Sequence, residues 1–209
     1  MKLLKILGIV GLIALGIAGK ANAANLSYSG AFSSDYEAPL FTFTLNSVSN
    51  ISLRTWSYAG GTNANGQPIA SGGFDPVLVL FDSNGDFFGQ YDNGRDFADS
   101  GTGLKLDTEA EITGLDAGEY FIAIMQYGNV APSHKDDAFA TTNFSLALFG
   151  DENTQCSLFV DQGGNCRDGH WAFDIVTADI PGTVPEPATL ALFALGLLGI
   201  ASSRRQKIG

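Results

Sequence analysis

Short runs that alternate apolar and polar side chains are the main pattern in the middle of the chain. Residues 41–45 read Phe-Thr-Phe-Thr-Leu, and residues 51–58 place Ile51 and Leu53 on one face. A repeat of two is that of a half-buried β-strand. No window between residues 24 and 183 keeps the i, i+3, i+4, i+7 spacing of an amphipathic helix for three turns. We therefore expect this region to be built of strands.

The clearest pair of strands is a hairpin. Residues 77–81 are wholly apolar, as in a strand buried on both faces, and residues 87–91 follow after Asp82-Ser83-Asn84-Gly85-Asp86. Asn-Gly is a strong turn signal and favours a type I′ turn. Further strand-like runs lie at residues 109–113, 119–125, 143–149 and 171–176. About eight short strands joined by turns predict an all-β fold, an antiparallel β-sandwich of the jelly-roll kind.

Two polar connections, residues 60–73 and 129–142, are longer than the common connections of about 2–6 residues. Loops of this length are usually either functional or mobile. The sequence leaves both interpretations open.

The N-terminus, residues 1–23, predicts a secretory signal peptide. Lys2 and Lys5 give it a positive start, and an apolar stretch broken only by glycines follows. Ala21 and Ala23 supply the small residues that a signal peptidase needs beside its cut. An uncleaved membrane anchor is the alternative, but the apolar stretch is short for a span. We expect cleavage after Ala23 and export across the inner membrane.

The C-terminal tail, residues 184–209, has three parts. These are a short motif, Val184-Pro185-Glu186-Pro187, an apolar run at residues 188–201, and the basic residues Arg204, Arg205 and Lys207. The prolines keep the motif extended, and the basic residues set the topology by holding the chain end on the cytoplasmic side. The apolar run of 14 residues would span about 21 Å as a helix, less than the roughly 30 Å hydrocarbon core. We expect a C-terminal hydrophobic helix that is held marginally in the membrane, as suits an anchor that is removed later.

Other interpretations of this tail remain open. A plain single-pass anchor would need no processing, and a helix packed on its own domain would need no membrane. The packed helix fits poorly because the run is apolar all round and not amphipathic. A GPI signal also fits poorly, since the chain continues beyond the apolar run.

The region between the two end segments, residues 24–183, is strongly acidic and forms one predicted domain. It holds 21 Asp and Glu against 5 Lys and Arg, a formal charge of −16, whereas the whole chain carries −11. Such a surface repels nucleic-acid phosphates and anionic membranes. We therefore expect no nucleic-acid partner, and a domain that is extracytoplasmic or neutralised by divalent cations.

Cys156 and Cys166 are the two cysteines of the chain, and they lie in a polar, glycine-rich stretch at residues 151–169. In an oxidising compartment such a pair favours a small-loop disulfide. A zinc site is a weaker interpretation because two thiolates and the distant His170 lack the usual paired spacing. We expect a disulfide.

Oxygen-bearing side chains are concentrated along the hairpin. Asp82, Asn84 and Asp86 lie in its turn, while Asp75 and Asp92 approach each other at its open end. Calcium takes about six to eight oxygen ligands, so these five residues are candidate calcium ligands. The alternative is a turn in which Asp serves backbone geometry alone. We expect no cofactor to be required, and calcium is the metal that the pattern would accept.

Two aromatic residues precede the first long connection. Trp56 and Tyr58 are candidate ligand-binding residues and could form a sugar-stacking platform with Tyr91, Tyr127 and Trp171. Packing in the core is the commoner place for aromatic residues in a sandwich. No arrangement of serine, histidine and carboxylate follows a known catalytic motif. We expect no enzyme activity.

The tail resembles a known sorting signal. Val184-Pro185-Glu186-Pro187, the apolar run and the Arg-Arg end are similar to the PEP-CTERM sorting signal of Gram-negative bacteria. The resemblance covers about 25 residues. It implies processing by exosortase, a membrane enzyme like the cysteine transpeptidases, and an association with exopolysaccharide and biofilm or floc matrix.

A second resemblance covers residues 74–124. The run from Asp75 to Asp86 and the run from Leu115 to Tyr120 resemble the hairpin D-P-x-L-x-L-(F/Y)-D-x-x-G and the strand entry L-x-A-G-x-Y of the pre-peptidase C-terminal (PPC) β-sandwich. The resemblance implies a non-catalytic domain of a family in which calcium sites are known. That family occurs both on secreted enzymes and alone in PEP-CTERM proteins.

Together these patterns predict a non-catalytic protein of the cell surface or extracellular matrix of a Gram-negative bacterium, anchored in the membrane only in transit. An exosortase-type enzyme, exopolysaccharide, and the membrane through the C-terminal helix are the expected partners. A calcium-dependent, lectin-like carbohydrate-binding module is the alternative. A secreted polysaccharide hydrolase is a third class of function.

Overall fold

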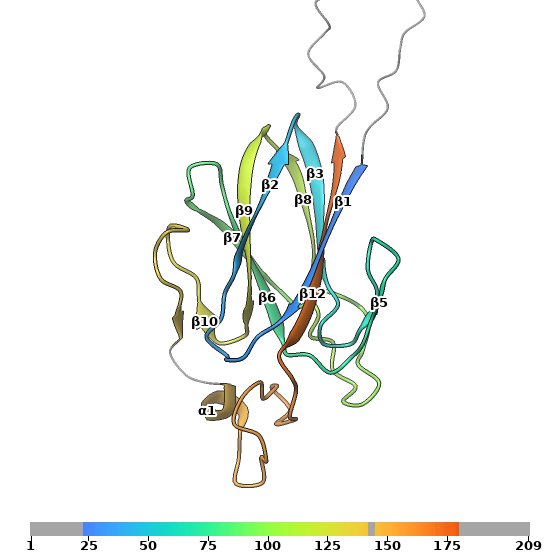
Figure 1. Ribbon diagram of the computed structural model, residues 1–209, viewed down its shortest axis with the longest axis vertical. Helices are drawn as coiled ribbons and strands as arrows, with labels where there is room; N and C mark the ends of the chain where they lie inside the picture. The colour runs from blue at the N-terminus through green and yellow to red at the C-terminus, as the bar shows by residue number, and fades with distance from the viewer. Residues whose placement is uncertain (1–22, 142–144, 180–209) are drawn as a thin grey trace, which may run out of the picture.

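Two four-stranded antiparallel sheets face each other in the computed structural model, which describes residues 23–141 and 145–179 (Figure 1). The first sheet has the order β1 (Ala23–Ala31), β12 (His170–Asp179), β3 (Ser49–Thr55), β8 (Glu109–Leu115). The second has the order β2 (Leu40–Leu45), β9 (Gly118–Gln126), β6 (Pro76–Phe81), β7 (Phe87–Asp92). The expected all-β antiparallel sandwich is confirmed.

Smaller elements lie in the connections. Strands β4 (Gly61–Thr62) and β5 (Pro68–Ile69) form one short ribbon, and β10 (Asn129–Val130) and β11 (Ala140–Thr141) form another. A single helical turn, α1 (Ser145–Phe149), follows. Both connections that we singled out by length therefore contain a two-stranded ribbon.

The main core lies between the two sheets. In β3 the alternation buries Ile51, Leu53 and Thr55 and leaves the residues between them partly exposed, as the sequence pattern predicts. Leu78 and Leu80 of β6 pack into the same cluster from the opposite sheet. Removal of these apolar side chains from water is the main source of stability for such a sandwich.

A second, smaller cluster covers the outer face of β6, because every residue of this strand is buried. Val77, Val79 and Phe81 pack there with Ala123 and Met125 of β9. Residues of the connection between β10 and β11 cover them, and the Phe139 ring meets that of Phe81 edge-on at 6.1 Å. The wholly apolar run at residues 77–81 thus has an apolar neighbour on each face.

Most of the long connections lie at one end of the sandwich. The connection between β10 and β11 instead runs along the outer face of the second sheet to the hairpin turn, where the Lys135 N–H donates to the Gly85 carbonyl. The chain enters β1 and leaves β12 at the other end, where Ala23 pairs with Ala178 (Figure 1). Short connections at residues 46–48, 82–86 and 116–117 join strands at that end. The opposite end, which we call the loop end, consists of residues 32–39, 56–75, 93–108 and 145–169.

Two local expectations are wrong. Residues 143–149 were expected as a strand, but residues 145–149 form α1, in which Ser145 is the one buried residue. The buried carboxylate of Asp35 accepts hydrogen bonds from the Ser145 backbone N–H, at 2.9 Å, and hydroxyl, at 2.6 Å. This contact fixes the start of the helical turn and overrides the alternating pattern.

The hairpin turn also differs from the type I′ geometry. Gly85 has a φ of 90°, but Asn84 is not among the residues with positive φ. Type I′ requires positive φ at both central positions. Next to the turn, the register between β6 and β7 shifts between Leu80 and Phe81, so the hairpin does not keep the regular pairing that a two-residue turn would give.

The expected signal peptide, including Ala21, and the expected sorting tail lie outside the described residues, and Ala23 is the first residue of β1. Within residues 23–141 and 145–179, no helix has both the length and the apolar character needed to cross a membrane.

Candidate functional site

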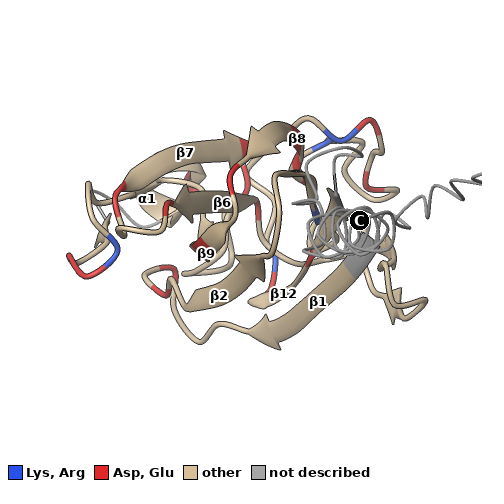
Figure 2. Cartoon of the chain, turned by 90° about the horizontal axis from the view of Figure 1, so that it is seen from above, with Lys and Arg blue, Asp and Glu red and all other residues tan. Residues whose placement is uncertain are grey.

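Buried aspartates organise the loop end. Asp35, Asp99, Asp107 and Asp161 are each at most 3% exposed. Each accepts hydrogen bonds from backbone N–H groups of the long connections. Bonds to an ionised acceptor are among the strongest hydrogen bonds in proteins. The loop end is therefore built around negative charge. Along the ribbon of Figure 2, segments coloured for Lys and Arg are few beside those coloured for Asp and Glu.

Asp107 holds the chain where it leaves β3. Its Oδ1 accepts hydrogen bonds from the Thr55 hydroxyl at 2.9 Å and the Tyr58 N–H at 3.1 Å. Its Oδ2 accepts from the Ala59 N–H at 2.8 Å and from Arg95 Nη1 at 3.2 Å. The carboxylate thus ties the connection at residues 56–75 to the one at residues 93–108, which also holds its ion-pair partner Arg95. All the acceptor positions of the carboxylate are used.

Tyr58 is fully buried, and its hydroxyl donates to the Asp161 carboxylate. The Arg167 guanidinium lies over its ring at 4.0 Å and donates to its carbonyl oxygen at 2.6 Å. Burial, and secondly the bond to Asp161, raise the pKa of Tyr58 above its usual value. The expectation that Tyr58 offers a stacking surface to a ligand is wrong, because its ring is enclosed by the protein.

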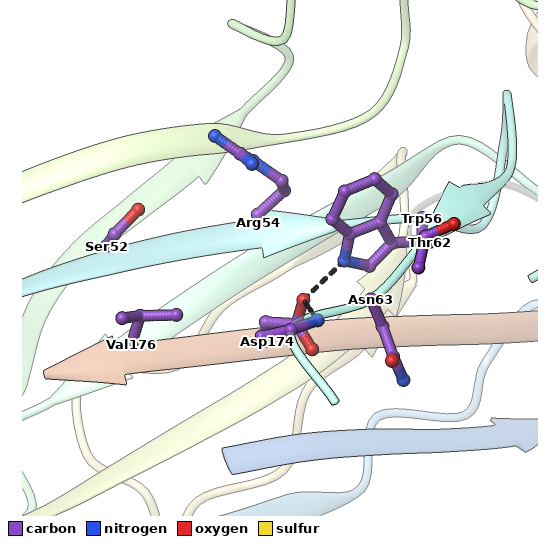
Figure 3. A pocket seen from close by; sticks show the side chains of 8 residues that line it. Ser52, Arg54, Trp56, Thr62, Asn63, Asp174 and Val176 are labelled. Carbon is purple, nitrogen blue, oxygen red and sulfur yellow. Dashed lines mark hydrogen bonds between the residues drawn. The ribbon is translucent and has the colours of Figure 1, made fainter. Parts of the chain in front are cut away.

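A groove of about 150 Å³ lies on the outer face of the first sheet (Figure 3). Strand β3, β12 and the β4–β5 ribbon line it with Ser52, Arg54, Trp56, Thr62, Asn63, Ala64, Asp174 and Val176. The register brings these side chains together, since Arg54 pairs with Asp174 and Ser52 with Val176. The groove therefore combines hydroxyl, amide, carboxylate and guanidinium groups with an aromatic edge.

Trp56 forms one wall of this groove but is only 8% exposed. Its Nε1 donates to Asp174 at 2.6 Å, as Figure 3 shows. The Arg95 guanidinium covers the ring at 4.1 Å, and Gly61 packs so closely that a Cβ there would lie 2.8 Å from two ring carbons. Trp56 presents an edge and not a face, so the expected stacking platform is not formed. Trp171 is also buried.

Asp174 connects the groove to its surroundings. Besides Trp56, it accepts hydrogen bonds from the Ala64 N–H at 2.7 Å and the Ser27 hydroxyl at 2.5 Å. On the other side of the groove, Arg54 forms an ion pair with Glu109 of β8. The groove is therefore preformed by contacts from all four strands of the sheet and from the β4–β5 ribbon.

The five candidate calcium ligands fall into two groups. Asp82, Asn84 and Asp86 lie in the turn, where Asp82 Oδ1 accepts the N–H groups of Asn84 at 2.8 Å and Asp86 at 3.1 Å. Asp75 and Asp92 lie at the other end of a six-residue strand, about 20 Å away. The five residues do not form one site. Nowhere in the described ranges do three Asp, Glu, His or Cys side chains gather as a metal site.

Asp75 is the unusual member of this set. It is 2% exposed, and its Oδ1 has no hydrogen-bond partner. Burial, and then the charges of Asp92, Asp161 and Asp107, raise the pKa of Asp75 well above its usual value. Burial also raises the pKa of Asp92.

Cys156 and Cys166 form a disulfide in the last connection, with their Cα atoms 5.7 Å apart. The bridge closes a small loop of the loop end. Beside it, Leu146, Ala147, Ser157 and Leu158 line an apolar hollow of about 380 Å³.

Sequence reasoning missed most of the groove and of the aspartate network. Asp35, Asp107 and Asp174 stand in no motif, and nothing in the sequence marks them as buried. Asp99 and Asp161 do stand next to glycine-containing stretches, which signals a turn held by the Asp side chain. That signal identifies the turn but not the distant hydrogen-bond donors that the carboxylate binds.

Asp107→Ala is expected to destabilise the protein by about 3–5 kcal/mol, because it leaves the Arg95 charge and the N–H groups of Tyr58 and Ala59 without their acceptor. Asp96→Ala is the matched control, because Asp96 forms an exposed pair with Lys105 and should leave stability unchanged. Urea unfolding followed by fluorescence measures both. Equal midpoints for the two variants would contradict the structural role of Asp107.

Asp99 should make stability depend on acid pH. Burial alone would raise its pKa, but hydrogen bonds from Thr102 and Arg167 outweigh burial and hold the pKa below 3.8. The folded form is thus stabilised above pH 3.8, and this stabilisation is lost as the pH falls through the lowered pKa. Asp99→Asn should be less stable than wild type at pH 7, and the difference should shrink below about pH 4. A difference independent of pH would contradict this assignment.

The strand-rich domain and the C-terminal tail differ in how well they match known proteins. No curated protein matches it. Among solved structures, the pre-peptidase C-terminal domain of a collagenase from Bacillus anthracis is similar over 73% of this chain and 88% of that one, with 12% identity and a TM-score of 0.34. A likeness this weak supports no conclusion about fold or function. Residues 183–205 match the model of the PEP-CTERM protein-sorting motif, and the chain therefore carries that sorting signal.

Proposed function

We propose that the chain is a non-catalytic protein of the cell surface or exopolysaccharide matrix that presents its loop end away from the membrane. The observation that carries this proposal is the sorting motif at residues 183–205. The motif implies export, passage through the membrane and processing by exosortase. The surface or matrix destination rests on the association of such motifs with exopolysaccharide.

The topology supports this mode of presentation. Because β1 and β12 pair from Ala23↔Ala178 to Ala31↔His170, the chain leaves β12 at the end where it enters β1. Nine paired residues extend about 30 Å. The loop end therefore lies about 30 Å from the point at which the chain continues toward the sorting motif.

The use of the carboxylates supports a non-catalytic role. Asp99, Asp107 and Asp161 accept hydrogen bonds from backbone N–H groups, and Asp99 and Asp107 also pair with arginines. A general acid or base needs to exchange its proton with a substrate. Carboxylates that accept hydrogen bonds from backbone N–H groups instead fix the conformation of the surface loops.

The sorting step is tested by the intact mass of the protein from cell and medium fractions. A Pro185→Ala, Glu186→Ala variant should keep its tail, whereas wild type should lose both residues 1–23 and the tail. Pro181→Ala is the control, since it changes a proline just outside the matched residues 183–205, and it should be processed as wild type. A full-length C-terminus in all three proteins would mean a plain anchor.

The groove at Arg54 and Asp174 favours carbohydrate binding as a second candidate function. Its polar side chains donate and accept hydrogen bonds in the manner that sugar hydroxyls need, and Val176 and the Trp56 edge add apolar contact. The volume of about 150 Å³ suits one sugar unit or a chain end.

Affinity electrophoresis in gels that contain neutral polysaccharide tests this candidate. Arg54→Ala should abolish retardation, because Arg54 lines the groove with a side chain that is 38% exposed. Lys105→Ala removes the same charge from an exposed site outside the groove and should retain it. Two results would exclude the groove as a carbohydrate site. One is that neither the wild type nor Lys105→Ala is retarded, and the other is that all three proteins are retarded equally.

A further inference from the structure

Phe97 is an exposed aromatic residue that a buried arginine links to the wall of the groove. It lies in the connection at residues 93–108 and is 50% exposed. The Arg95 guanidinium carbon lies over the Phe97 ring at 4.8 Å and over the Trp56 ring at 4.1 Å. Because both distances are measured from the same atom, the two ring centres are less than about 9 Å apart. Phe97 is therefore a close neighbour of the groove.

Arg95 is a rigid support for this ring. Its side chain is only 9% exposed, pairs with Asp107 at 3.2 Å and donates to the Gly60 carbonyl oxygen at 3.1 Å. Asp107 is fully buried and is itself fixed by two backbone N–H groups. A cation over the face of an aromatic ring attracts it. Phe97 is thus held at one face by a fixed cation, while half of the residue remains open to solvent.

The groove and Phe97 supply complementary parts of a sugar-binding surface. The groove offers hydroxyl, amide, guanidinium and carboxylate groups, but of Trp56 only an edge is accessible. Sugar rings carry hydroxyl groups at their rims and C–H groups on their faces. A site for them combines a few placed polar groups with an apolar, flat surface. Phe97 provides the exposed ring that Trp56 does not.

The charges indicate which polysaccharides this surface accepts. Residues 24–183 carry a formal charge of −16, which repels polyanions. Among the described residues that line the groove, Arg54 is the one cation, and it already pairs with Glu109. Arg95 is likewise paired, with Asp107. Neither arginine is left to neutralise the carboxylate of an acidic sugar, so an uncharged chain fits best.

We propose that the groove and Phe97 together bind two adjoining units of an uncharged polysaccharide, one unit in the groove and the next stacked on Phe97. This inference rests on the carbohydrate function proposed for the groove and adds a second subsite to it. The groove volume of about 150 Å³ holds one unit, and Phe97 lies within reach of the next. Two linked contacts bind more tightly than one, because the second forms without a separate loss of translational freedom.

Affinity electrophoresis of the full-length chain in nonionic detergent tests the second subsite, with galactomannan, dextran and a soluble β-glucan as probes. Phe97→Ala should weaken binding to the polymer that retards wild type by about five- to tenfold. Phe88→Ala is the matched control, because it removes the same side chain from β7, where Phe88 is 47% exposed, and it should bind as wild type.

Two further measurements separate stacking from a structural role of Phe97. Phe97→Tyr keeps the ring face and should bind as wild type, whereas Phe97→Leu keeps an apolar side chain without the flat face and should bind as weakly as Phe97→Ala. As competitors against wild type, disaccharides of the polymer should be about five- to tenfold stronger than the monosaccharide. Against Phe97→Ala the two competitors should be equal. A merely structural role would change the urea midpoint but not this preference.

The possible failures are distinguishable. No retardation of wild type by any of the three polymers would overturn both the function of the groove and this inference. Retardation that is lost in Arg54→Ala but unchanged in Phe97→Ala would keep the groove as a carbohydrate site and overturn the second subsite alone. Equal losses in Phe97→Ala and Phe88→Ala would also overturn it, because they would mean general apolar contact.

Discussion

The structure depends on carboxylates that are buried under the long connections and bind their backbone N–H groups. A sandwich of two sheets buries its strands easily, but connections of a dozen residues or more leave many N–H groups without sheet partners. Asp35, Asp107 and Asp161 meet this need with charged acceptors at a few central points. Each carboxylate accepts several donors from segments that are far apart in sequence. The arrangement of the loop end follows from these few anchors together with the stacked, buried rings of Phe32, Phe74 and Phe159.

The buried carboxylates also explain why two aromatic side chains are enclosed by the protein. Trp56 and Tyr58 follow β3 directly, and both donate to buried carboxylates, Asp174 and Asp161 respectively. Arginines lie over both rings at about 4 Å, a geometry in which cation and ring attract each other. The rings thus link the acidic groups to the basic ones. Their surface is used inside the protein and not offered to a ligand.

Sequence patterns predicted those parts of the fold that local chemistry determines. The alternation in β3, the apolar run of β6 and the hairpin between β6 and β7 correspond to the observed strands, because burial on one or both faces leaves a direct trace in residue type. Strand β1 was not predicted because it begins at the expected signal cleavage site. The helical turn at Ser145 was misjudged, because a contact with Asp35, 110 residues away, decides it.

The candidate site was less accessible to prediction for the same reason. The spacing of residues along the chain predicted that Asp75 and Asp92 lie at one end of the hairpin and Asp82 at the other. The pairing of two consecutive strands is enough to determine these positions. The spacing could not show that Gln126 ends the neighbouring strand, or that Arg54 and Asp174 face each other across β3 and β12. Those relationships come from the order of strands in each sheet, which local sequence does not encode.

The position of β12 between β1 and β3 has a consequence for folding. The first sheet is incomplete until its last strand has been synthesised, since β12 makes both of the pairings that hold β1 to the rest. Contacts between such distant segments form slowly. In a chain that lacks β12, β1 therefore has no sheet partner, and the first sheet closes only after the last strand of the domain is available.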